Sequence, residues 1–78
     1  MDEVIGVECR FEEDGGVVVH RVAHRGQWWP VEQGRQWVDP QGRHVLVILP
    51  SQEAAELLLE KETLRWLLRP RVPRRYII

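Results

Sequence analysis

The sequence predicts a mainly β fold, a small antiparallel meander or SH3-like barrel, on three observations. Apolar and polar residues alternate along residues 5–12, which is the period of a half-buried strand. Turn-forming residues recur at Asp14-Gly15-Gly16 and Pro40-Gln41-Gly42. The segments between the turns are rich in β-branched and aromatic residues, which favour strands. A chain of 78 residues has room for one domain with one core.

The first half of the chain predicts a hairpin. The residues expected to face the core along the first strand alternate with polar ones: Ile5, Val7, Cys9 and Phe11. Asp14-Gly15-Gly16 is a hairpin turn signal, and residues 17–25 form the returning strand.

The middle of the chain predicts three further strands. Residues 27–32 form a short aromatic strand, in which Pro30 indicates an edge position or a bulge because proline cannot donate a ladder hydrogen bond. Gln33-Gly34 is expected to turn the chain into residues 35–39. After Pro40-Gln41-Gly42, residues 43–49 form the most apolar and therefore central strand.

Residues 50–69 allow two interpretations. Ser51 can cap a helix over 51–61, because the alanines, leucines and glutamates there have high helix propensity. That helix would make the fold α+β, and a single helix running to Pro70 is a further alternative. From Thr63 onward the alternation is that of a strand. The expected organisation is a β-rich domain over 1–69 and an extended, basic, proline-containing arm over 70–78.

Composition limits the classes of protein to consider. The net charge is −1 and 44 % of residues are hydrophobic, as in a folded globular domain. No segment has the length of a membrane span. The acidic start lacks the features of a secretory signal and there is a single cysteine, so we expect a cytoplasmic protein. The scarcity of thermolabile residues fits a thermophile, and a GC-rich genome explains the arginine bias equally well.

Charge is distributed unevenly along the chain. Residues 2–14 carry six acidic side chains and one arginine, whereas the tail carries four arginines and no acid. Such asymmetry can mark a nucleic-acid-binding arm. We favour the alternative that the two termini lie side by side, because the first and last strands of a small antiparallel barrel are often neighbours.

Four tryptophans mark the core and a possible contact surface. Trp28 and Trp29 are adjacent on a strand and must point to opposite faces. We expect one of them to join Trp37 and Trp66 in the core. The other is then covered by the C-terminal arm or forms an exposed docking patch.

The residues offer little for catalysis. Cys9 alternates with core positions and is expected to be a small buried hydrophobe. His20 and His24 lie on one face of a presumed strand, but about 13 Å apart, too far to share a metal ion. A site joining them to His44 and Cys9 has no recognised ligand spacing, and Ser51 suits a turn or cap. We therefore expect no catalytic residue, no cofactor and no metal.

The function that the sequence favours is a protein-interaction or accessory module, with a protein or a second copy as the partner. The apolar Ile77-Ile78 end suits a homo-oligomer. The alternative is a single-stranded nucleic-acid-binding barrel, which would use aromatic stacking and arginines but is opposed by the acidic N-terminal strand. The candidate binding surface comprises Trp28, Trp29, Arg25, Arg71, Arg74, Arg75 and Tyr76.

Two motifs resemble a small Trp-rich bacterial domain family of unknown function. They are Arg25-Gly26-Gln27-Trp28-Trp29-Pro30-Val31 and Thr63-Leu64-Arg65-Trp66-Leu67-Leu68, and the resemblance covers about residues 15–70. The family usually has glycine where this chain has Leu64, and a longer aromatic stretch where this chain has residues 39–42. A similar segment ends the inactive Y-family polymerase homologues of the bacterial mutasome, a damage-tolerance assembly.

The resemblance implies a structural choice and a biological setting. In the family pattern residues 54–59 form a strand and residues 60–63 the turn that follows it. Two leucines would then face three residues across a hairpin, Leu57 and Leu59 opposite Leu64, Trp66 and Leu68. This favours the barrel over the helix. It also associates the alternative nucleic-acid function with DNA damage tolerance, and it implies no catalytic residue.

Overall fold

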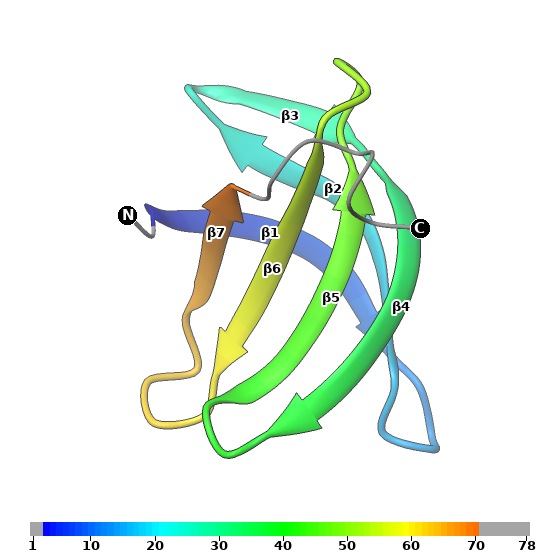
Figure 1. The fold of residues 1–78 in the computed structure, drawn as a ribbon, viewed down its shortest axis with the longest axis vertical. Coiled ribbons are helices and arrows are strands. Elements are labelled where there is room, and N and C mark those ends of the chain that lie inside the picture. Colours follow the sequence, from blue (N-terminus) through cyan, green and yellow to red (C-terminus); the bar gives the residue numbers. More distant parts are fainter. Residues whose placement is uncertain (1–2, 71–78) are drawn as a thin grey trace.

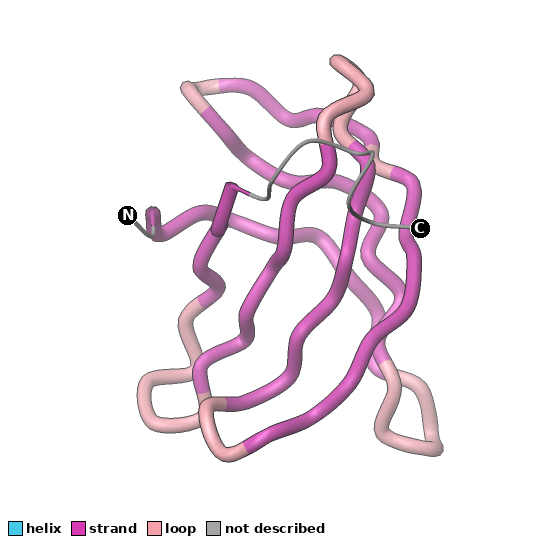
Figure 2. The backbone as a smooth tube through the Cα atoms, in the orientation of Figure 1, coloured by secondary structure: helices cyan, strands magenta, loops and turns pink. Residues whose placement is uncertain are grey.

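A computed structural model describes residues 3–70, and residues 1–2 and 71–78 lie outside the described range. The described chain consists of strands joined by turns, with no helix among these residues (Figures 1 and 2). The strands are β1 (Glu3–Phe11), β2 (Val17–His24), β3 (Gln27–Pro30), β4 (Glu32–Asp39), β5 (Gly42–Ile48), β6 (Ala54–Glu60) and β7 (Trp66–Pro70). The predicted mainly β fold is confirmed. The part of the arm beyond Pro70 lies outside the described residues.

All strand pairs are antiparallel and form one sheet in the order β3-β2-β1-β7-β6-β5-β4. The first and last strands are neighbours, as expected for a small barrel. The sheet curls into a half-barrel, so that β1 and β2 pass behind β5 and β6 in Figure 1. One face of this curled sheet therefore lines the core, and the other faces outward.

The ambiguous segment 51–61 contains strand β6 rather than a helix. Leu57 pairs with Val45 on β5 and with Leu68 on β7, and Leu59 pairs with Trp66. This confirms the hairpin implied by the resemblance. The strand lacks clean alternation because both of its faces are buried, and a short apolar run of that kind does not distinguish a helix from a buried strand.

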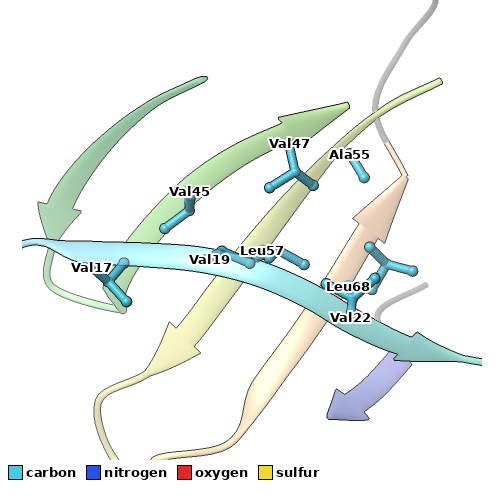
Figure 3. Packing of buried hydrophobic residues seen from close by; sticks show 8 residues of the cluster. All are labelled: Val17, Val19, Val22, Val45, Val47, Ala55, Leu57 and Leu68. Atoms are coloured by element: carbon cyan, nitrogen blue, oxygen red, sulfur yellow. The ribbon is translucent and has the colours of Figure 1, made fainter. Parts of the chain in front are cut away.

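The core lies between β2 and the inner face of β5, β6 and β7 (Figure 3). Its buried side chains are mostly β-branched or leucine, and they are Val17, Val19, Val22, Val45, Val47, Ala55, Leu57 and Leu68. Ile5, Val7 and Cys9 pack against this cluster from β1, as predicted. Phe11, predicted to share that face, is exposed because it ends the strand beside the turn.

Glutamine side chains join β2 to β4 where the half-barrel would otherwise be open. Gln33 accepts a hydrogen bond from the Val19 N–H at 2.7 Å and donates to the Val17 carbonyl at 2.9 Å. Gln36 accepts from the Val17 N–H at 3.0 Å and donates to the same carbonyl at 2.9 Å. The predicted turn at Gln33-Gly34 is wrong, because both residues lie within β4 at an irregularity of the register.

Replacement of Gln33 by methionine tests this side-chain closure. Methionine keeps the length but leaves the Val19 N–H without its acceptor, so we expect a loss of about 1 to 3 kcal/mol in the free energy of unfolding. Urea unfolding followed by tryptophan fluorescence measures the change. Gln41→Met, at an exposed position, should stay within about 0.5 kcal/mol of the wild type, and equal losses in the two variants would contradict the closure.

Leu64 adopts a left-handed backbone, with φ of 59°, in the turn between β6 and β7. The predicted packing of Leu64 across the hairpin is wrong, because the residue is 74 % exposed. Its amide closes the turn by donating to the Glu60 carbonyl at 2.7 Å. The sequence therefore places an exposed leucine where the backbone conformation favours glycine.

Leu64→Gly should stabilise the protein by about 0.5 to 1 kcal/mol, because relief of the left-handed strain exceeds the cost of a more flexible unfolded chain. The melting temperature should rise by about 2 to 8 °C. Leu64→Ala removes the same side chain without relieving the backbone and should give no gain. A rise that is equal in the two variants would show that side-chain exposure, not backbone strain, was the cause.

Candidate docking surface on β1 to β3

The two adjacent tryptophans lie on β3, the outermost strand of the sheet, as Pro30 predicted. Trp28 pairs with Ala23 and Trp29 pairs with Val22, so their side chains take opposite faces. They are 50 % and 37 % exposed, respectively. The prediction that one of them fills the core is wrong, because β3 lies at the sheet edge, beyond the strands that enclose the core.

The indole N–H of Trp29 donates to the His24 carbonyl at 3.1 Å, which fixes the position of this ring. The side chain of Trp28 lies on the other side of the sheet, facing away from the core. A Cβ built on Gly6 would stand 3.5 Å from Cη2 of Trp28 and 3.3 Å from Cβ of Ala23. The indole therefore lies over two small residues, which support its ring without covering its outer side.

Arg21 and Glu8 flank this ring. The Arg21 guanidinium carbon lies 5.5 Å from the Trp28 ring centroid, within range of a cation–π contact. The same guanidinium binds Glu8 through two bonds, Nε to Oε1 at 2.9 Å and Nη2 to Oε2 at 2.8 Å. The hydrogen bond from Arg21 lowers the pKa of Glu8, so both groups are charged at neutral pH and neutralise each other.

We call this group the Trp28 platform, and it consists of Trp28, Gly6, Ala23, Arg21 and Glu8. Of the binding residues that the sequence predicted, Arg25 also lies in this region, together with Trp28 and Trp29. It lies exposed in the two-residue turn before β3, where Arg25 and Gly26 both have positive φ, 55° and 78°. That combination is a type I′ hairpin turn. The remaining four proposed residues, Arg71, Arg74, Arg75 and Tyr76, lie outside the described residues.

The other two tryptophans have separate roles. Trp66 packs against the core cluster, as predicted. The prediction of a core position for Trp37 is wrong: its ring stacks on His44, with centroids 5.0 Å apart and planes 2° apart. Since His44 pairs with Leu58, on the face opposite the core residues Val45 and Leu57, this stack lies on the outer face.

A buried polar cluster surrounds His44, and the sequence did not predict it. Nδ1 of His44 lies 2.5 Å from Oε2 of Glu56, and Nε2 lies 2.8 Å from Oδ2 of Asp39. The second contact is close enough for an ion pair, although its alignment is poor for a hydrogen bond. Arg69 Nη1 stands 3.5 Å from the same Glu56 oxygen. The only signal in the sequence was a histidine that borders the apolar run of β5 and a glutamate inside the apolar run of β6.

The Asp39 carboxylate is stabilised by its surroundings. Contact with His44 is the main cause that lowers its pKa, and the Gln41 and Gly42 N–H groups lower it further. A carboxyl whose pKa is lower in the folded state stabilises the fold above its unfolded value, about 3.9, and that contribution is lost as pH falls through the folded pKa.

Asp39→Asn should therefore lower the urea midpoint at pH 7 and make the acid limb of a stability-versus-pH curve shallower. Urea unfolding at several values from pH 7 to pH 3 measures both effects. An unchanged acid limb in the variant would mean that other carboxyl groups dominate acid unfolding and that Asp39 is not stabilised in the fold.

The remaining titratable candidates do not converge. The register of β1 and β2 slips between Glu8 and Cys9, leaving His20 as the extra residue of a bulge, so the prediction that His20 and His24 share a face through even spacing is wrong. His24 Nε2 lies 3.4 Å from Glu3. Burial raises the pKa of Cys9, as expected of an unreactive thiol. Within residues 3–70, no group of three or more potential ligands is placed to hold a metal ion.

Two findings complete the description. The described part of the chain contains no helix that is long and apolar enough to cross a membrane. Comparisons with protein-family models, with curated proteins and with solved structures found no match.

Proposed function

We propose that this protein is a non-enzymatic interaction module that binds a polypeptide partner through the Trp28 platform. The observation that carries the proposal is the half-exposed Trp28 indole, supported from below by Gly6 and Ala23. Exposed aromatic rings of this kind supply much of the binding energy of protein interfaces. A ring that is already fixed loses little conformational freedom when a partner covers it.

The chemistry of the platform favours a partner with an apolar side chain. Arg21 and Glu8 satisfy each other, so the rim of the ring is polar but carries no net charge. An apolar anchor surrounded by a polar rim is the usual arrangement of a protein-binding surface. An aliphatic or proline side chain on the partner would cover the indole without leaving a buried charge unpaired.

The nucleic-acid alternative retains one supporting feature and loses another. Trp28 offers a ring on which a base can stack. Arg21, however, has its charge neutralised by Glu8 and contributes little to binding a phosphate backbone. The resemblance to a mutasome segment remains the main reason to test this alternative.

Selection from a phage-displayed random peptide library on the full chain tests the proposal. Selected peptides should bind the wild type and should bind Trp28→Ala at least about tenfold more weakly. Phe11→Ala is the matched control, since Phe11 is an exposed aromatic residue on β1 that is not part of the Trp28 platform. The proposal is wrong if the peptides bind Trp28→Ala as well as they bind the wild type.

Two further measurements distinguish the partners. Sedimentation equilibrium of the wild type and Trp28→Ala shows whether a second copy occupies the platform, because only then does the variant dissociate a dimer. Titration with oligo(dT) at low salt tests the alternative. Binding that weakens steeply with salt and is lost in Trp28→Ala would replace the polypeptide by a single-stranded nucleic acid.

A further inference from the structure

Strand β3 directs main-chain hydrogen-bonding groups of Trp28 away from the sheet. The two-residue type I′ turn at Arg25-Gly26 joins β2 to β3, and in such a hairpin the residues that flank the turn, His24 and Gln27, form a hydrogen-bonded pair. Hydrogen-bonded and non-hydrogen-bonded pairs alternate along an antiparallel ladder. Trp28, opposite Ala23, is therefore in a non-hydrogen-bonded pair, and its N–H and C=O point away from β2.

Pro30 has the same orientation two residues further along β3, opposite Arg21. Its C=O also points outward, and proline has no N–H that would need a partner there. The edge of β3 therefore offers one donor and two acceptors, the N–H and C=O of Trp28 and the C=O of Pro30. β3 ends the described sheet on this side, and its four residues are all exposed.

The adjoining part of the same sheet edge is closed by side chains. Beyond the end of β3, the main-chain groups of Val17 and Val19 on β2 are hydrogen-bonded to the side chains of Gln33 and Gln36. Within residues 3–70, no such side chain bonds the outward groups of Trp28. The fold therefore caps one part of this edge and leaves the part beside the Trp28 platform open.

We propose that the partner binds this edge as an extended segment, which adds one strand to the sheet beside β3. The inference rests on the proposed function and specifies the conformation of the polypeptide that covers Trp28. The added strand is antiparallel, as in every other pair of the described sheet. Its residue opposite Trp28 exchanges two main-chain hydrogen bonds with Trp28, and the residue two positions before donates its N–H to the Pro30 carbonyl.

Side chains of the added strand alternate between the two tryptophans. Residues that face each other in a ladder have Cβ atoms about 5 Å apart on one face of the sheet, so the residue opposite Trp28 lies on the Trp28 platform. Its neighbour lies opposite Trp29, on the other face. The residue opposite Trp28 is therefore aliphatic or aromatic but not proline, because its N–H must donate to the Trp28 carbonyl.

Methylation of single backbone nitrogens in a selected peptide tests the inference. Affinity for the full chain should fall at least about tenfold when either of two nitrogens, two residues apart, is methylated, because each loses a main-chain hydrogen bond. Methylation of the nitrogen between them should leave the Kd nearly unchanged, because that N–H points away from β3. An ester in place of either sensitive amide removes the N–H without adding bulk and should also weaken binding.

Amide hydrogen exchange of the protein gives an independent measurement. In the free protein, the Trp28 amide should exchange at least about tenfold faster than that of Trp29, whose N–H is bonded within the ladder opposite Val22. The bound peptide should slow the exchange of Trp28 at least about tenfold. Trp29 is the internal control, because its ladder bond is the same in the free and bound protein.

Each outcome decides the matter. Alternating sensitivity to methylation, together with protection of the Trp28 amide, supports the inference. Binding that depends on Trp28 but shows neither alternation nor protection would overturn it and leave the proposed function intact. Peptides that bind Trp28→Ala as well as the wild type would overturn both. A Trp28 amide that is already protected in the free protein would also overturn the inference, because the protein itself would then occupy this edge.

Discussion

Gly42→Ala is expected to destabilise the protein by about 3 kcal/mol or more, because the added methyl group would overlap the backbone of β6 and the turn that follows it. Gly42 opens β5 and has φ of 147°, a backbone conformation that other residues rarely adopt. A Cβ at this position would stand 2.0 Å from the Leu59 carbonyl oxygen and 3.0 Å from the Lys61 nitrogen. Both atoms belong to the backbone and cannot rotate away, so β5 and β6 would have to separate locally.

The expected loss is a large part of the total stability. A chain of this length has an unfolding free energy on the order of 4 to 12 kcal/mol. Urea unfolding and the dispersion of the amide NMR spectrum measure the outcome. Gly26→Ala is the matched control, because Gly26 has φ of 78° but no atom within 4 Å of the position that a Cβ would take. It should lose only about 1 kcal/mol, and equal losses would mean that backbone conformation alone, not the clash, decides the result.

Glu56→Ala is expected to cost about 3 kcal/mol, because it removes a buried carboxylate that contacts both His44 and Arg69. The Glu56 carboxylate lies between His44 Nδ1 and Arg69. His44 is itself 3 % exposed and cannot turn to solvent for a replacement partner. Urea unfolding at pH 7 measures the loss, and Glu12→Ala, which removes an exposed ion pair with Arg10, should have a far smaller effect.

A double-mutant cycle identifies the source of this effect. Glu56→Leu and His44→Phe each remove the contact between the two side chains. The double variant replaces both by apolar side chains and can keep a ring stacked on Trp37. The double variant should therefore be less destabilised than the sum of the single variants. Strictly additive losses would show that His44 and Glu56 do not stabilise each other.

Local patterns in the sequence predicted most of the fold. The alternation along residues 5–12 and the Asp14-Gly15-Gly16 and Pro40-Gln41-Gly42 turns indicated four of the strands, and Pro30 indicated the sheet edge. Local propensity left residues 51–61 undecided. Their strand depends on burial of both faces, which is a property of the whole sheet rather than of the segment.

The predictions from the sequence failed mainly where residues far apart in the chain come into contact. The closure of β2 on β4 uses side-chain amides of Gln33 and Gln36, and no periodicity marks a glutamine as a substitute for a ladder bond. The stack of Trp37 on His44 depends on register, so the count of tryptophans could not separate it from the core. For the candidate site, the sequence placed Trp28 and Trp29 on opposite faces but could not show that both remain exposed.

The central claim is that a polypeptide partner covers Trp28. The four indole N–H signals of the chain, resolved in a ¹⁵N NMR spectrum and assigned by single substitutions, test it most directly during titration with a selected peptide. We expect the Trp28 signal to shift most and those of Trp37 and Trp66 to stay in place. Equal small shifts of all four signals, or a largest shift at Trp37, would contradict the claim and place the partner elsewhere.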